Sequence, residues 1–231
     1  MSSHAYTAGS MPSAQALARV RRPGAGGALR IAGLCLLAMA LVWVVAELVP
    51  AAHVRDAVLL RNFTHLEGPQ VDSVANFLLK LIEPLLLTIW GAALVLVAIA
   101  RDRPRVALAV AVVMGFAPLT ADRLKPLLAH PHARAGAIHL GPASWPSGHS
   151  TAALALALCA VLVSPPRLRP LVAVLGAAFA LAVGCALLIL AWHMPSDVLG
   201  GYLMAALWMA LAVAGLRAAE RRWPAAGVRR A

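Results

Sequence analysis

Apolar residues occur along the chain in long runs that are separated by polar segments. A run that approaches the roughly 20 residues needed to cross a bilayer as a helix predicts a membrane span. Six such runs can be placed, at residues 31–49, 84–100, 106–119, 150–163, 171–192 and 198–216. The fourth run is short, because a helix rises about 1.5 Å per residue and the hydrocarbon core is about 30 Å thick. We therefore expect its outer end to lie below the lipid headgroups. The pattern predicts an all-α protein, a six-transmembrane-helix bundle.

The polar segments divide the chain into three parts. Residues 1–30 are rich in Ser, Ala, Gly and Arg and have no apolar periodicity, which predicts a flexible cytoplasmic tail. Residues 31–217 form the predicted six-helix membrane domain, and residues 218–231 a basic cytoplasmic tail. Within the domain, the polar segment 51–83 has apolar residues at helical spacing only in its last part, which predicts an interfacial helix there. We interpret the first run as a retained span, because it is long for a signal peptide and lacks a clear cleavage site.

Composition agrees with a membrane protein. Hydrophobic residues make up 61% of the chain and charged residues 13%, which is far from the average of soluble domains. The net charge of +11 would suit nucleic acid, but the basic residues are dispersed around the apolar runs and form no nucleic-acid-binding motif. We therefore predict no nucleic-acid partner. The three cysteines fall inside apolar runs, so no disulfide framework is predicted.

The distribution of lysine and arginine predicts the orientation, because short cytoplasmic loops carry the excess of these residues. With the N-terminus inside, fourteen of the 20 basic residues are cytoplasmic: Arg19, Arg21, Arg22, Arg30, Arg101, Arg103, Arg105, Arg167, Arg169, Arg217, Arg221, Arg222, Arg229 and Arg230. The other six are outside: Arg55, Arg61, Lys80, Arg123, Lys125 and Arg134. We therefore predict an integral protein of the plasma membrane with both termini in the cytoplasm.

This topology brings distant polar residues to the same side of the membrane. Between His149 and His193 the chain crosses inward once and returns once, so both histidines face outward. Lys125, at the outward end of the third span, joins them. Ionisable residues at membrane depth are by default candidates for function, so an extracytoplasmic site is predicted here. Trp145 and Trp192, next to the two histidine motifs, are expected to be interfacial anchors.

The residue types at this site suit phosphate chemistry. Ser147 is a natural N-cap for the helix that follows, and Gly148 lets a ligand approach the backbone, so the helix start can hold an anion. His149 is a candidate proton donor near neutral pH. His193 and Asp197 are four residues apart, a spacing that lets a carboxylate orient an imidazole for nucleophilic attack.

These residues resemble the type-2 phosphatidic acid phosphatases, a family related to the bacterial acid phosphatases and the vanadium haloperoxidases. Its membrane members have six helices and three signature segments: a Lys followed by Arg-Pro, a Pro-Ser-Gly-His, and a Ser-Arg followed by His and Asp. The resemblance extends over roughly residues 70–217. The residues that match, in order, are Lys125, Pro146, Ser147, Gly148, His149, His193 and Asp197.

The resemblance implies a role for each matching residue. His193 would attack phosphorus to form a phosphohistidine, Asp197 would orient it, and His149 would protonate the leaving alcohol. This scheme requires no metal or cofactor, and we predict none. The phosphoryl oxygens would be held by Lys125, Ser147 and the backbone of Gly148.

Two positions depart from the family pattern. The family's first arginine falls at His132 by the usual spacing, or at His130 in an alternative register, so an imidazole replaces a guanidinium and both histidines become candidate phosphate contacts. The Ser-Arg pair falls at Ala186 and Leu187. The loss of two bidentate donors argues against vanadate-dependent halide oxidation. A zinc site in the histidine-containing loop is not predicted, because no carboxylate or thiolate lies at ligand spacing.

The sequence therefore predicts a phosphatase that hydrolyses a phosphomonoester or diphosphate on a membrane phospholipid or polyprenyl phosphate at the extracytoplasmic face. Two alternatives stay open. The first is a catalytically weak relative that binds or translocates anionic lipid, which the missing arginines favour. The second is a phosphotransferase, in which a lipid or sugar hydroxyl replaces water on the phosphohistidine. Nothing in the sequence indicates the oligomeric state.

Overall fold

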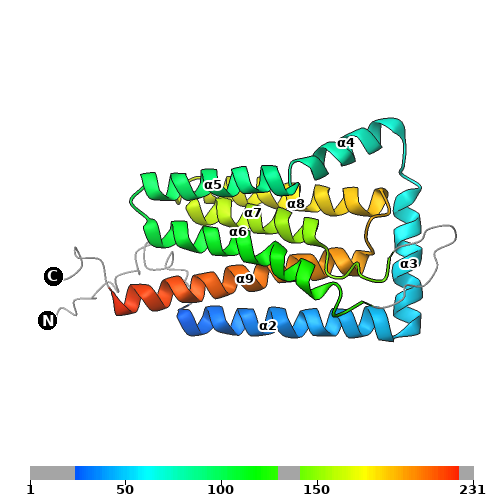
Figure 1. The fold of residues 1–231 in the computed structure, drawn as a ribbon, viewed down its shortest axis with the longest axis horizontal. Coiled ribbons are helices and arrows are strands. Elements are labelled where there is room, and N and C mark those ends of the chain that lie inside the picture. Colours follow the sequence, from blue (N-terminus) through cyan, green and yellow to red (C-terminus); the bar gives the residue numbers. More distant parts are fainter. Residues whose placement is uncertain (1–23, 130–140, 224–231) are drawn as a thin grey trace, which may run out of the picture.

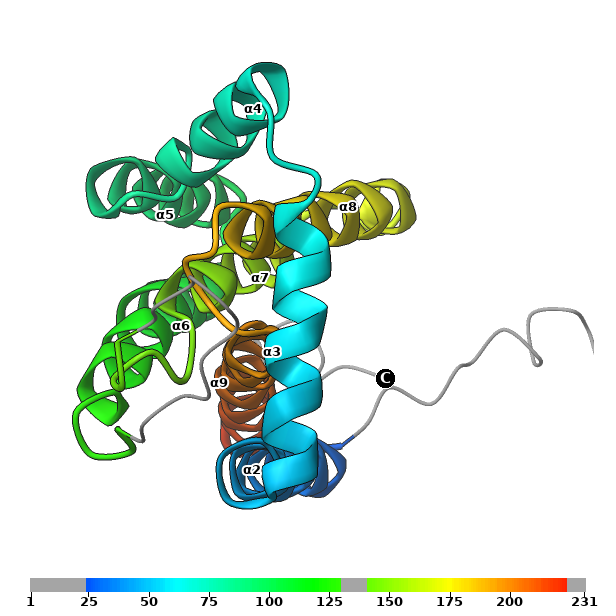
Figure 2. The same ribbon diagram turned by 90° about the vertical axis from the view of Figure 1, so that its right-hand side faces the viewer.

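The computed structural model describes residues 24–129 and 141–223, and its regular elements in those ranges are all helical. The predicted all-α class is therefore confirmed. Long helices run side by side, and a shorter one, α3, lies across one end of the bundle (Figures 1 and 2). In chain order the elements are α2 (Ala25–Trp43), the π-helical turn η1 (Val44–Leu48), α3 (Pro50–Thr64), α4 (Pro69–Lys80), α5 (Pro84–Ala100), α6 (Pro104–Leu124), α7 (Gly148–Val163), α8 (Arg169–Ile189) and α9 (Pro195–Arg222).

Helix α7 occupies the centre of the bundle and packs against α5, α6, α8 and α9. Its buried face consists mostly of alanine, together with Ser150, Thr151 and Cys159. These small side chains let neighbouring helices approach closely. A Cβ atom added to Gly176 of α8, for example, would lie 2.8 Å from the Cβ of Ala157. The short α7 is thus enclosed by other helices, which reduces its contact with lipid.

Several helices have the length and composition of membrane spans. Within the described ranges, four helical segments qualify: α2 continued through η1, α6, α8 and α9. Helices α4 and α5 qualify together as a fifth span, bent by 53°, and α7 is a shorter apolar helix. The chain is therefore a multi-pass membrane protein, and the count of six spans stays a prediction.

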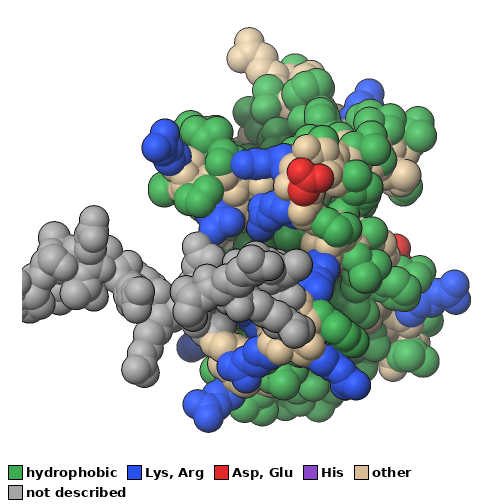
Figure 3. Space-filling view, turned by 90° about the vertical axis from the view of Figure 1, so that its left-hand side faces the viewer, with side chains coloured by type: hydrophobic (Ala, Val, Ile, Leu, Met, Phe, Trp, Pro, Cys, Tyr) green, Lys and Arg blue, Asp and Glu red, His purple; other side chains and the backbone are tan. Residues whose placement is uncertain are grey.

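The two ends of the bundle differ in charge. The end where α6 and α8 begin and α9 terminates carries many basic side chains (Figure 3), and these are arginines. Arg101 donates a hydrogen bond from Nη1 to the carbonyl oxygen of Val163 at 3.1 Å, and Arg103 donates to that of Leu162 at 3.4 Å. Both arginines thereby pair with carbonyls at the C-terminus of α7, where cations are favourable. The assignment of this basic end to the cytoplasm stays a prediction.

Some predicted boundaries were wrong. Helix α2 begins at Ala25 and α9 ends at Arg222, so both helices extend into segments predicted as tails. The extension of α9 consists of alanine, glutamate and arginine, which are strong helix formers even where no apolar run continues. The extension of α2 contains two glycines beside alanine, leucine and arginine. Helix α6 likewise continues to Leu124, beyond the predicted end at residue 119.

The polar segment after the first span contains a helix that the sequence did not predict. Only Ala57 and Leu60 are buried along helix α3, so few of its positions need to be apolar and its sequence shows no sustained apolar pattern. Pro50 stands at its start, where the fixed φ of proline suits the first helical turn. The predicted helix near residues 71–82 is present as α4, which packs against α8 through Ala75 and Leu79.

Candidate active site

The first turn of α7 is fixed by hydrogen bonds around Ser147. The Ser147 hydroxyl accepts from the backbone N–H of Ser150 at 3.4 Å, as expected of an N-cap. The carbonyl oxygen of Ser147 accepts from Thr151 Oγ1 at 2.8 Å and from Ser150 Oγ at 3.2 Å. All three side chains are fully buried. The start of α7 is therefore a rigid helix N-terminus, the kind of position where backbone N–H groups can hold an anion.

The second segment of the site is formed by a tight turn after α8. Ala191 has a φ of 51°, in the left-handed region. The N–H of Trp192 donates to the carbonyl of Leu187 at 2.9 Å, and the N–H of Ala191 donates to that of Leu188 at 3.1 Å. This is the hydrogen-bond pattern of a Schellman helix end, in which the chain reverses sharply. The turn delivers His193 to the end of the bundle, directly before α9 begins.

His193 and Asp197 meet as their spacing predicts. His193 Nδ1 lies 3.2 Å from Asp197 Oδ2, which also accepts from the N–H of Met194 at 2.9 Å. His193 is 8% exposed, and Asp197 is completely buried. Because the carboxylate engages Nδ1, the nitrogen left for chemistry is Nε2. The other carboxylate oxygen, Asp197 Oδ1, has no hydrogen-bond partner among the residues that the structure describes.

The two segments are joined directly. The N–H of Ser147 donates to the carbonyl oxygen of Asp197 at 2.9 Å. A Cβ atom on Gly201 would overlap Ser150 Oγ and would lie 2.5 Å from the carbonyl oxygen of Ser147. Sequence reasoning missed Gly201, although adjacent glycines inside an apolar helix are a signal for close approach of another backbone. The absence of a side chain at this position lets α7 start directly against α9.

The two tryptophans next to the motifs differ in their environment. Trp145 is only 4% exposed, and its indole lies where a Cβ on Gly200 would be. The prediction of an interfacial anchor was therefore wrong for Trp145, which packs into the bundle because Gly200 leaves room for its ring. Trp192 is half exposed, and its ring lies edge-on to that of His149 with centroids 5.7 Å apart.

Lys125 follows the last turn of α6 and reaches the start of α7. Its Nζ pairs with Asp122 Oδ1 at 2.8 Å. A Cβ atom on Gly148 would lie 3.0 Å from that oxygen and 3.5 Å from Lys125 Nζ. His149 is also close enough to interact electrostatically with Lys125 and His193. The structure thus brings together at one end of the bundle the site residues that the sequence selected within the described ranges.

A cavity of about 340 Å³ opens beside these residues between α5, α6 and α7. Asp122, Lys125, Gly148 and His149 line one part of it. The remaining wall is largely apolar and is formed by Ile82, Pro84, Leu87, Thr88, Met114, Gly115, Pro118 and Ala152. A cavity with one charged part and one apolar part suits a ligand that carries an anionic group on a hydrocarbon chain.

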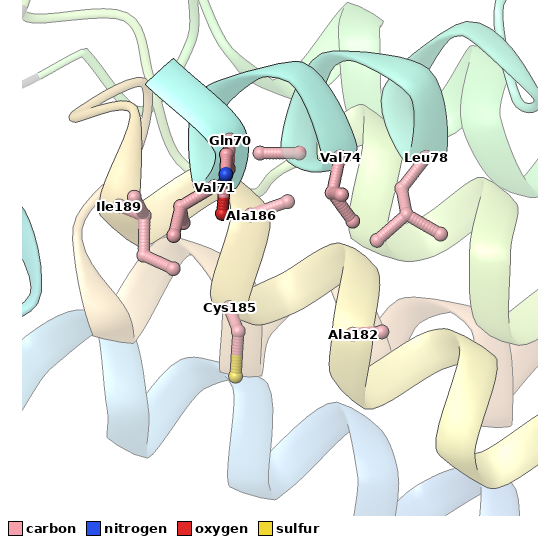
Figure 4. A pocket seen from close by; sticks show the side chains of 9 residues that line it. Gln70, Val71, Val74, Leu78, Ala182, Cys185, Ala186 and Ile189 are labelled. Carbon is pink, nitrogen blue, oxygen red and sulfur yellow. The ribbon is translucent and has the colours of Figure 1, made fainter. Parts of the chain in front are cut away.

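The departures from the family pattern have different outcomes. Leu187 is fully buried in an apolar cluster, so no guanidinium enters the site from this position. Ala186 lines an apolar groove between α4 and α8 (Figure 4). His130 and His132, the predicted phosphate contacts, lie outside the described residues. Within residues 24–129 and 141–223, no three His, Cys, Asp or Glu side chains cluster as a metal site would require.

One polar contact at the site was not predicted. Asp56 of α3 accepts hydrogen bonds from the hydroxyl and the backbone N–H of Ser196, the residue before Asp197. Sequence reasoning could not find this pair, because the two residues are 140 positions apart and neither belongs to a recognisable motif.

Comparisons with known proteins agree with this geometry. The profile of the PAP2 superfamily matches residues 105–221, which include Lys125 and both histidine motifs. The chain is similar to the crystal structure of the first transmembrane PAP2 type phosphatidylglycerolphosphate phosphatase from Bacillus subtilis, with a TM-score of 0.63 and 20% identity over 86% of this chain and 98% of that one. A likeness at this identity supports the fold alone. No curated protein matches. Because the profile covers about half of the sequence, including the three segments of the site, the chain belongs to the PAP2 superfamily.

Proposed function

We propose that this protein is a membrane phosphatase that removes a phosphate or diphosphate from a lipid at the extracytoplasmic face, through a phosphohistidine on His193. The observation that carries the proposal is the convergence of His193, His149 and Lys125 at one end of the bundle, beside a cavity with an apolar wall. The family membership supports a phosphatase, and the apolar helices support a membrane-borne substrate.

In the first step, Nε2 of His193 attacks phosphorus while the bond from phosphorus to the leaving oxygen breaks. The Nδ1–H donates to Asp197 Oδ2, so the carboxylate stabilises the positive charge that develops on the ring. His149 gives its proton to the leaving oxygen, and the dephosphorylated lipid departs as a neutral alcohol when the substrate is a monoester. In the second step, water loses a proton to His149 and attacks the phosphohistidine, which releases inorganic phosphate and regenerates both histidines.

The phosphoryl oxygens are held by the start of α7 and by Lys125. The backbone N–H groups of that first turn and the ammonium group both stabilise charge that grows in the transition state. Asp122 pairs with Lys125 in the free protein, so a phosphate group competes with this carboxylate for the ammonium group. His132 and His130 are proposed as further phosphate contacts, because the family's first arginine falls at His132 or, in the alternative register, at His130.

The surroundings of the charged groups support a lipid substrate. The wall formed by Leu87, Met114 and their neighbours continues the cavity along the apolar faces of α5 and α6. A hydrocarbon chain attached to the phosphate can occupy this part, and burial of each CH₂ group contributes about 0.8 kcal/mol. A phosphate on a small soluble molecule would gain nothing from it.

One observation favours the alternative of a catalytically weak lipid-binding relative. The position of the family's second arginine is the buried Leu187, and no arginine of the described residues lines the cavity beside the site. Such a protein would bind anionic lipid at the same helix N-terminus without fast turnover. A phosphotransferase would use the same intermediate, and the nature of the acceptor decides between the two reactions.

The decisive experiment measures phosphate release by the purified protein in detergent with EDTA. The panel consists of phosphatidic acid, phosphatidylglycerol phosphate, and polyprenyl phosphate and diphosphate. We expect turnover of at least one lipid, loss of that activity in His193→Ala, and full activity in His65→Ala, which changes an exposed histidine at the end of α3. Lipid binding without turnover would support the alternative, and phosphate transferred to an added alcohol would identify a transferase.

A further inference from the structure

Helix α3 lies across the site end of the bundle, in front of α8 and α9 (Figure 2). Its inner face carries Ala57 and Leu60, which are buried in the same apolar cluster as Met194 and Val198 at the start of α9. Asp56 lies next to Ala57 and is partly buried. A partly buried carboxylate on the inner face of a helix requires a polar partner.

That partner is the first turn of α9. Asp56 Oδ2 accepts from Ser196 Oγ at 2.5 Å, and Asp56 Oδ1 accepts from the backbone N–H of Ser196 at 3.2 Å. Ser196 is the second residue of α9, so its N–H has no partner inside the helix. The N-cap residue, Met194, has no side-chain hydroxyl, carboxylate or amide of the kind that usually caps this group. Asp56 therefore caps α9 from a distant part of the chain.

The capped turn is the one that holds the catalytic pair. Ser196 lies between His193 and Asp197, whose carboxylate already binds the His193 ring and the N–H of Met194. The pKa of Asp56 is raised above its usual value, mainly by burial and also by the neighbouring Asp197. Hydrogen bonds from Ser196 and the nearby His53 offset part of this increase. Asp56 thus belongs to the same electrostatic environment as the pair, although it does not contact the His193 ring.

We infer that Asp56 is a positioning residue: by capping α9 through Ser196, it holds Asp197 and His193 in the orientation that aims Nε2 at phosphorus. The inference rests on the proposed function of His193. Outer-shell residues that orient metal-ligating histidines contribute about 10-fold to 100-fold to affinity or activity, and we expect a similar factor for a residue that orients the attacking His193. Loss of such a residue affects the step in which the imidazole attacks and leaves the binding of phosphate at α7 and Lys125 intact.

The test compares Asp56→Ala, Asp56→Asn and Ser196→Ala with the wild type. Asp56→Ala should lower kcat about 10-fold to 100-fold, with KM within about twofold, and should slow phosphoenzyme formation by the same factor. Asp56→Asn keeps an oxygen acceptor and should recover part of the loss, and Ser196→Ala keeps the backbone contact and should lose less than Asp56→Ala. Asp72→Ala is the matched control, because Asp72 accepts from the N–H of Gly68 at the start of α4, away from the site.

A second measurement does not depend on turnover. Orthovanadate forms a bond to an attacking imidazole, whereas inorganic phosphate uses only the anion contacts. Asp56→Ala should therefore weaken vanadate binding about 10-fold or more and leave phosphate binding unchanged. If the wild type hydrolyses no lipid but the vanadate effect is present, the proposed reaction is wrong and the positioning role stands. An Asp56→Ala variant that behaves like Asp72→Ala, or that weakens both anions equally, overturns the inference. A wild type that binds no vanadate also overturns it.

Discussion

Individual glycines set the distance between the two catalytic segments. Gly201 faces the carbonyl oxygen of Ser147 and the hydroxyl of Ser150, and both of these are fixed by the capped start of α7. A side chain on Gly201 would clash with the backbone at the start of α7. Because the first turn of α7 is held together by its own hydrogen bonds, the whole turn would have to shift away from α9.

We expect Gly201→Ala to destabilise the protein by about 1–3 kcal/mol through overpacking. Activity should fall on the order of 100-fold, because a shift of about 1 Å misplaces the anion contacts. Gly215→Ala is the control on the same helix, since a Cβ there meets nothing within 4 Å. Thermal unfolding in detergent and phosphate release measure both effects. Equal behaviour of the two variants contradicts the close packing described at Gly201.

His149 acts in the proposed mechanism only as a proton donor and acceptor. We expect His149→Ala to slow phosphoenzyme formation by about 10²-fold to 10⁴-fold with a lipid alcohol as leaving group. With an aryl phosphate the loss should be much smaller, because the leaving phenolate is stable without a proton. Rapid-quench measurements on the two substrates provide the comparison, and equal losses indicate that His149 only supports the fold.

At the scale of residues, the sequence predicted the local parts of the site. From the order of the spans it also predicted that Lys125, His149 and His193 lie at one end of the bundle. It missed the contacts that Asp56 and Gly201 make across the bundle.

His193 precedes the N-cap of α9 and Asp197 lies in its first turn, so their contact is local in the chain. The Ser147 cap is likewise local. Asp56 could not be predicted, because its role depends on how α3 lies across the bundle.

At the scale of elements, the turn between α8 and α9 decides where His193 lies. Ala191 adopts a left-handed conformation there, which costs an L-residue other than glycine roughly 1–2 kcal/mol. The two hydrogen bonds of the Schellman end keep the turn in place despite this cost.

Ala191→Gly should therefore stabilise the protein. After the greater entropy of glycine in the unfolded chain is subtracted, we expect a gain of up to about 1 kcal/mol, or roughly 2–4 °C in the unfolding midpoint. The same substitution at Ala182, within α8, should destabilise by about 1 kcal/mol. The opposite signs make the pair of variants informative, and a lower midpoint in Ala191→Gly contradicts the strain assigned to this turn.

The sequence predicted those helices that contain a long, uninterrupted apolar run. The helices α5, α7 and α8 fall close to their predicted ranges for this reason. Helix α3 was missed because few of its residues are buried, so its period carries no signal. The first residues of α2 and the last of α9 were missed because charged and small residues continue a helix without continuing a hydrophobic pattern.

At the scale of the whole molecule, charge separates the two ends of the bundle. Arg103, before α6, and Arg167, between α7 and α8, lie at the basic end. Lys125, after α6, and helix α3 lie at the other end. We expect cysteines introduced at Arg103 and Arg167, on a background without native cysteines, to resist an impermeant thiol reagent in intact cells. A cysteine at Glu67, exposed between α3 and α4, should react. Labelling in the opposite sense contradicts the proposal that the site faces outward.

The packing of α2 along α9 bears on how the chain is assembled. Helix α2 is synthesised long before α9, so its inner face of Ala28, Ala32 and Met39 has only lipid to contact while the middle helices insert. Asp56 is likewise synthesised 140 residues before its partner Ser196. The first and the last of the described helices therefore pack against each other, so the bundle is complete only after α9 has inserted. A nascent chain that stalls before α9 leaves the Asp56 carboxylate without Ser196 and the inner face of α2 without the helix that covers it.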